Sequence, residues 1–333
     1  GKAIELILSD SIEHGPWPVS RLKSLDFLPV LGVSNIKLTP LLPLQKLFDL
    51  FDGDKGPMDL TVIYSYDGAS SYSGHISSAS FDSRDISFRS SEILFHLRLG
   101  TFGDTQAFFK IPRLELTNGG TYISITDMKL DSQSKNAETV FPVGDGIFAI
   151  GELSIRSPGS FVLIRDVRSK AVISETFGVL SMSNALEVFQ IKVNGEEVGG
   201  FELSLSAKNL RAKELESLTD LFKKLESSSG YEKTLIENSI KGFVYALLEE
   251  RPSVALDKFA YKSEYGNSSI SLVVDLQKPS AYINNSQAWA SAIASIKLEA
   301  STSRSMLYSI AASMSKEGKD YSDMPNKIIG YVV

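Results

Sequence analysis

The stretch Ile270-Ser271-Leu272-Val273-Val274-Asp275-Leu276 decides the fold class of this chain. Large apolar residues occupy every second position from Ile270 to Leu276, and Ser271 and Asp275 lie between them. Successive side chains of a β-strand point to opposite faces, so this alternation predicts a half-buried strand with one apolar face. The same pattern occurs in Phe201-Glu202-Leu203-Ser204-Leu205 and at several other places along the chain.

Short polar turns separate these strand-like segments. Glycine pairs with turn-forming residues at Asp67-Gly68, Asn118-Gly119-Gly120, Asp145-Gly146, Asn194-Gly195 and Gly199-Gly200. Two-residue turns join antiparallel strands, whereas parallel strands need long crossover connections. We therefore predict a mainly β (α+β) fold, with a large curved antiparallel sheet of hairpin-connected strands.

Helical periodicity is confined to a few segments. Residues 211–226 and 231–250 place apolar residues on one stripe each and predict a helical hairpin, with Asn209 as the N-cap of its first helix. Shorter helices are predicted at 19–31 and 303–316, and one more within 40–50. We expect the helical hairpin and these short helices to pack on the sheet.

These elements divide the chain into two parts. Residues 1–208 are predicted to form a strand-rich meander with an early short helix. Residues 209–333 are predicted to add the helical hairpin, a strand pair and the last helix, packed on the same sheet.

Composition excludes several classes of protein. The 333 residues are 43% hydrophobic and 22% charged with a net charge of −6, which is typical of a globular chain without the basic surface that nucleic acids require. The chain has no cysteine, so disulfides and thiolate chemistry are excluded. No apolar run reaches the length of about 20 residues that spans a bilayer as a helix.

The segment from Asp10 to Pro18, which ends in His14-Gly15-Pro16-Trp17-Pro18, is the most distinctive of the chain. Together with Gly199-Gly200-Phe201-Glu202-Leu203-Ser204-Leu205 before the helical hairpin, it resembles the YdgA-like family of uncharacterised bacterial inner-membrane and periplasmic proteins. The resemblance implies a large periplasmic part that an N-terminal segment anchors to the inner membrane. The chain starts at Gly1 within a strand-like pattern, so we expect a fragment that lacks this anchor.

The residues His14, Gly15, Pro16, Trp17 and Pro18 have two interpretations. They form either a contact site for a ligand or partner, or a rigid turn. In the turn, Gly15 supplies an unusual backbone angle, Pro16 and Pro18 restrict φ, and Trp17 covers the edge of the core. The structural interpretation is the one we favour, because proline-rich turns with an aromatic residue are usually architectural.

Catalytic, cofactor and metal sites are not predicted. His14 with Asp10 and Glu13, or His75 with Asp82 and Asp85, contain metal-binding residue types, but neither set has a diagnostic spacing. No Gly-x-Ser-x-Gly elbow is present. The neighbouring carboxylates Glu196-Glu197 and Glu249-Glu250 are interpreted as solvated surface groups.

We therefore expect a non-enzymatic, periplasm-facing binding or scaffold module without a cofactor. Its expected partners are an envelope protein, a lipid or a second copy of the chain through open strand edges, and not a nucleic acid. The alternative is that a lipid or hydrophobic ligand binds in a groove of the sheet, which requires that the helices leave part of the apolar face open. If the helices cover that face, they complete an ordinary core. Envelope hydrolysis is the weaker alternative.

Overall fold

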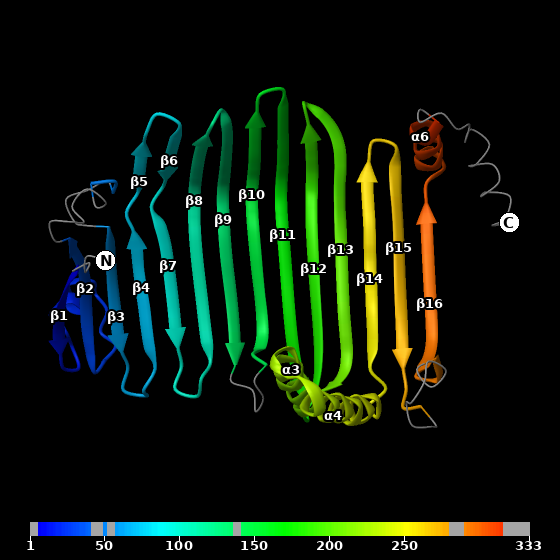
Figure 1. The fold of residues 1–333 in the computed structure, drawn as a ribbon. Coiled ribbons are helices and arrows are strands. Elements are labelled where there is room, and N and C mark those ends of the chain that lie inside the picture. The colour runs from blue at the N-terminus through cyan, green and yellow to red at the C-terminus, as the bar shows by residue number, and fades with distance from the viewer. Residues whose placement is uncertain (1–5, 41–48, 52–56, 136–140, 280–289, 316–333) are drawn as a thin grey trace. The chain divides into compact units, whose positions relative to one another are not determined.

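The computed structural model describes residues 6–40, 49–51, 57–135, 141–279 and 290–315. The chain divides into two compact units, and its helices and strands are labelled in Figure 1. Unit 1 comprises residues 1–137 and 142–170, and unit 2 comprises residues 138–141 and 171–333. The strand β11 (Ser160–Thr176) carries the chain from unit 1 into unit 2.

Unit 1 is built from antiparallel strands and one short helix. Eight strands are hydrogen-bonded in the order β1-β2-β3-β4-β7-β8-β9-β10, and the small hairpin β5-β6 joins through a pairing of β6 with β8. The bounds are β1 Leu6–His14, α1 Val19–Lys23, β2 Gly32–Pro40, β3 Met58–Tyr64, β4 Ser70–Ile76, β5 Ala79–Asp82, β6 Ile86–Ser90, β7 Ile93–Leu99, β8 Thr105–Asn118, β9 Thr121–Lys135 and β10 Val143–Ser157.

Unit 2 contains the antiparallel run β12-β13-β14-β15-β16 and the helices of the C-terminal half. The bounds are β12 Val179–Val193, β13 Glu196–Arg211, α3 Ala212–Ser227, α4 Gly230–Leu248, β14 Ser253–Ser263, β15 Gly266–Leu276, β16 Ile293–Thr302 and α6 Arg304–Ser315. The prediction of a mainly β fold with hairpin-connected antiparallel strands and a helical hairpin is confirmed in the described residues.

Most of the predicted turns join consecutive strands. Gly68, Gly119, Gly120 and Gly195 all have positive φ, which glycine adopts without steric cost. Two predicted turns are wrong: Asp145-Gly146 lies inside β10, and Gly199-Gly200 lies inside β13.

The glycine pair at 199–200 has another physical reason. A Cβ atom on Gly200 would lie 2.5 Å from the carbonyl oxygen of Val188 and 2.3 Å from that of Phe189. The pairing of β12 with β13 shifts register between Val188 and Ile191. The glycines therefore allow a bulge in which two strands approach closely, and they do not reverse the chain.

The predicted helices are found with corrected ends. Asn209 is not an N-cap: it lies in β13 with φ +57°, and Arg211 precedes α3. The first helix ends at Lys23 and does not continue to residue 31, because Leu25 adopts a positive φ of 57°. The helix predicted within 40–50 falls mostly outside the described residues.

The helical hairpin packs at one end of the strands of unit 2, where β13 leads into α3 and α4 leads into β14 (Figure 1). Leu180, Leu210 and Ala212 form a buried cluster there, to which Leu215 of α3 and Leu247 of α4 contribute. The two helices therefore stay with β12 and β13 in one unit. Contacts divide the chain at residues 170/171, and the boundary at residues 208/209 stays a prediction.

Candidate functional site

The strands of unit 2 align their apolar side chains in rows that cross five strands. Residues that pair directly across antiparallel strands share a face of the sheet. Three consecutive rows are almost entirely apolar and contain no charged residue. They are Leu186–Leu203–Phe259–Ile270–Ala300, Asn184–Leu205–Leu256–Leu272–Leu298 and Met182–Ala207–Val254–Val274–Ile296. We call these fifteen residues the apolar face of unit 2.

The helical hairpin covers only one end of this face. Met182 and Ala207, at the β12–β13 side of the third row, pack against the buried cluster at the base of α3. Further along the rows, Leu205 is 45% exposed, Val254 is 49% exposed and Leu298 is 63% exposed. Of the two interpretations of the sequence, a completed core and an open apolar face, these exposed fractions favour the open face.

The opposite face of the same strands is polar. The Nζ atom of Lys258 lies 2.7 Å from a carboxylate oxygen of Glu202, and the hydroxyls of Ser269 and Ser301 are 2.8 Å apart. Lys297 and Glu299 of β16 lie on this side, between the apolar residues of the rows. The two faces therefore differ sharply in chemistry, as the period-two pattern predicts.

Unit 1 has a comparable apolar row. Leu60, Gly74, Phe95, Phe109, Leu130 and Phe148 pair in sequence from β3 to β10. Gly74 leaves space for an aromatic side chain, because a Cβ atom there would lie 2.7 Å from Cζ of Phe95. The ring of Phe95 thus lies against the backbone of the neighbouring strand.

The His14–Pro18 segment forms the connection between β1 and α1. Gly15 has a φ of +106°, and its N–H donates to the carbonyl of Leu31 at 3.2 Å. Trp17 is 57% exposed and its indole N–H donates to the carbonyl of Phe27, so it does not cover the core as expected. His14 is exposed and Pro18 is buried. A contact role for this segment stays a prediction.

His75 has two carboxylate neighbours that were not considered from the sequence. Its Nε2 atom lies 3.5 Å from a carboxylate oxygen of Asp59 and 3.6 Å from one of Glu92. Glu13, beside His14, accepts hydrogen bonds from the backbone N–H and the hydroxyl of Ser20. In the described part of the chain, no group of three or more histidine and carboxylate side chains is arranged to hold a metal ion.

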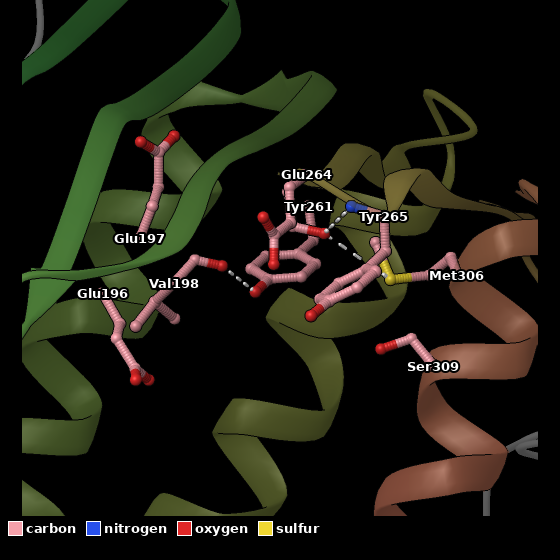
Figure 2. A pocket seen from close by; sticks show the side chains of 9 residues that line it. Glu196, Glu197, Val198, Tyr261, Glu264, Tyr265, Met306 and Ser309 are labelled. Carbon is pink, nitrogen blue, oxygen red and sulfur yellow. Dashed lines mark hydrogen bonds between the residues drawn. The ribbon is translucent and has the colours of Figure 1, made fainter.

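An acidic pocket of about 660 Å³ lies in unit 2, beside the turn from β14 to β15 (Figure 2). Glu196 and Glu197 of β13 and Glu264 of the turn line it with the rings of Tyr261 and Tyr265. The phenol of Tyr261 donates to the carbonyl of Val198. A hydrogen bond with Glu264 raises the pKa of Tyr265. A pocket with three carboxylates repels anionic ligands.

The second carboxylate pair, Glu249-Glu250, belongs to an ion-pair network at the end of α4. Arg211 lies 2.8 Å from Glu250 and 3.4 Å from Glu249, and Lys278 lies 2.5 Å from Glu249. The hydrogen bond from Lys278 and the charge of Lys278, with a smaller contribution from the charge of Arg211, lower the pKa of Glu249. These glutamates therefore connect α4 to β13 and to the residues after β15.

Replacing Lys278 with glutamine is expected to lower the melting temperature at pH 7. Because the pKa of Glu249 is lowered in the folded state, this carboxylate stabilises the fold at pH values above its ordinary pKa of 4.5. The stabilisation is lost as the pH falls through the pKa of the folded state. The difference between Lys278→Gln and the unaltered protein should therefore shrink as the pH is lowered below 4.5. Lys223→Gln, which removes the solvent-exposed pair with Asp220, is the control. Thermal melts at several pH values test this, and a pH-independent difference contradicts it.

No helix in the described residues is long and apolar enough to cross a membrane. The described geometry defines a class: antiparallel β proteins with strands that carry one apolar and one polar face. The chain belongs to the family described as "Bacterial protein of unknown function (DUF945)", which matches residues 1–328.

A curated relative is Protein YdgA of Escherichia coli strain K12. The two are 18% identical over 294 residues, which cover 82% of this chain and 58% of the relative. The chain thus spans little more than half the length of this protein. No solved structure matches the chain. The family resemblance inferred from the His14–Pro18 segment is confirmed.

Proposed function

We propose that this protein is a non-enzymatic binding module of the bacterial envelope that holds the acyl chain of a lipid on the apolar face of unit 2. The exposure of the rows through Leu205 and Leu298 carries the proposal. Removing exposed apolar surface from water is the main favourable term in such binding. The face offers contact area rather than a nucleophile or a base, which favours binding over hydrolysis.

The dimensions of the rows suit an extended alkyl chain. Neighbouring strands lie about 4.8 Å apart, so a row that crosses five strands is about 19 Å long. The side chains of the three rows present one polar group, the amide of Asn184, and no charge. An alkyl chain needs no hydrogen-bond partner, so it can cover such a surface without burying an unpaired polar group. An acyl chain is therefore the occupant that we propose.

The proposed location follows the sequence resemblance. The resemblance of this chain to the YdgA-like family implies a periplasmic part anchored to the inner membrane. Acyl chains are abundant there. We propose the same location for the full-length form of this protein. Fractionation of cells that express the full-length gene, with detection of the protein in the membrane or the periplasm, tests the location separately from ligand binding.

Leu298→Gln is expected to weaken binding of an uncharged monoacylglycerol about tenfold. Leu298 is 63% exposed, so covering it with a ligand contributes about 1 to 2 kcal/mol, and about 1.4 kcal/mol is tenfold in affinity. Titration calorimetry with the monoacylglycerol below its aggregation concentration measures the effect, and native mass spectrometry of the purified protein detects a lipid that remains bound.

The matched control is Lys297→Gln, which changes the neighbouring residue on the polar face of the same strand. Its affinity should equal that of the unaltered protein. Equal weakening by both variants would contradict binding on the apolar face. The proposal is also wrong if the titration shows no saturable binding, or if sedimentation shows that the apolar faces of two copies cover each other.

A further inference from the structure

A second pocket, of about 560 Å³, lies within unit 1. One wall is the segment that follows α1, with Leu28, Pro29 and Val30. The other wall comes from β3, β4, β7 and β8, including Ile63, Ser71, His96, Arg98 and Gln106. A volume of this size is in the range of small-molecule sites, which are generally apolar with a few polar groups that orient the ligand.

Arg21 of α1 borders this pocket and has an incomplete set of hydrogen bonds. It is 9% exposed, and its guanidinium pairs with Asp26 at 2.7 Å. Its Nε–H is buried and has no hydrogen-bond partner in the described structure. Buried donors are almost always satisfied, so an orphaned guanidinium N–H beside a cavity indicates that an acceptor from outside the chain belongs there.

A second guanidinium, that of Arg98, borders the same pocket. Arg98 lies on β7, paired with Ser71 on one side and Gln106 on the other. It is exposed and forms no ion pair with any residue that the structure describes. Asp67 is the acidic residue of the lining, and its carboxylate accepts a hydrogen bond from the N–H of Ala69 at 3.0 Å. The pocket therefore offers one free and one partly paired arginine.

The segment that contributes Leu28 to the pocket carries exposed apolar side chains. Leu28 is 71% exposed, and its neighbours Leu25 and Phe27 are 77% and 63% exposed. These side chains follow each other in the irregular segment between α1 and β2. Exposed apolar side chains beside a pocket that two arginines line match a ligand that has a charged group at one end and an alkyl group at the other.

We propose that this pocket binds the anionic headgroup of an amphiphile, a carboxylate or a phosphate, with Arg98 and Arg21 as its partners and the alkyl part along Leu25, Phe27 and Leu28. The planar guanidinium presents paired N–H donors that match both oxyanions. The inference does not rest on the apolar face of unit 2, since different residues carry it. The acidic pocket of unit 2 would repel the same headgroup.

The test is calorimetric titration of the full chain with dodecanoate and with the uncharged dodecanol, both below their aggregation concentrations. Dodecanoate is expected to bind saturably and at least about tenfold more tightly than dodecanol. Arg98→Gln should remove that about tenfold preference, whereas Lys110→Gln, which removes a positive charge from the neighbouring strand β8 outside the pocket, should keep it. Unchanged thermal melts of the variants show that they remain folded.

The same titrations separate this site from the apolar face. Loss of dodecanoate binding in Arg98→Gln but not in Leu298→Gln supports the arginine pocket. Loss of dodecanoate binding in Leu298→Gln alone overturns the arginine pocket and supports the proposed lipid binding on the apolar face. Equal affinity of the protein for dodecanoate and dodecanol also overturns the arginine pocket. Co-sedimentation with phosphatidylglycerol vesicles that Arg98→Gln abolishes would identify a membrane phosphate as the anion. Soluble dodecanoate binding without co-sedimentation would identify a free fatty acid.

Discussion

Replacing Leu180 with alanine is expected to lower the free energy of unfolding of unit 2 by about 3 kcal/mol. Leu180 is completely buried, and it packs with Leu210 and Ala212 at the point where β12 and β13 meet the helical hairpin. The substitution removes apolar contacts and leaves a cavity that the strands and α3 cannot fill without moving. Urea denaturation followed by circular dichroism measures the shift of the midpoint.

Leu298→Ala is the matched control for this experiment. The same atoms are removed from a leucine that is 63% exposed, so the expected loss is less than about 1 kcal/mol. If Leu298→Ala destabilises the protein as much as about 3 kcal/mol, the apolar face is covered in solution, which contradicts the proposed binding surface. If Leu180→Ala has only a small effect, the assigned core is wrong. A large effect of Leu180→Ala alone supports both.

Replacing Gly200 with alanine is expected to destabilise the protein by about 3 kcal/mol or to prevent folding. The new Cβ atom would lie 2.3 Å from the carbonyl oxygen of Phe189 and 2.5 Å from that of Val188. Both atoms belong to the backbone of β12, so relief of the clash requires that the two strands separate at the bulge. This would break hydrogen bonds between β12 and β13 beside the turn at Asn194-Gly195.

Gly242→Ala tests the same chemical change at an open position. Gly242 lies in α4, and a Cβ atom there meets nothing within 4 Å. Alanine is the better helix former, so this substitution should stabilise the protein by about 0.5 to 1 kcal/mol. Thermal melts of the two variants should therefore move in opposite directions. A fold that tolerates Gly200→Ala without loss would show that the bulge is not closely packed.

The sequence was informative wherever local periodicity decides the structure. The alternation in 201–205 and 270–276 placed both segments in long strands, now β13 and β15. The apolar stripes in 211–226 and 231–250 located α3 and α4 to within about two residues, the usual accuracy for helix ends. In each case, the signal and the structure lie within the same few residues.

The errors occurred where a distant segment decides the local structure. Gly199-Gly200 has the composition of a turn, but the close approach of β12 makes it a bulge. Asn209 is a suitable N-cap by type, but its amide donates to the carbonyl of Arg251 and its backbone stays in β13. Trp17 was expected to cover the edge of the core and is instead 57% exposed. Residue type alone does not distinguish these outcomes.

The sequence by itself determined that the strands have one apolar and one polar face, that they are antiparallel, and that a helical hairpin follows β13. The tertiary structure alone decided which side chains become neighbours. Leu205, Leu256, Leu272 and Leu298 form one row because of the registers of three strand pairs, and a shift of one residue in any pair would break it. Register depends on contacts between distant residues, and no local pattern records it.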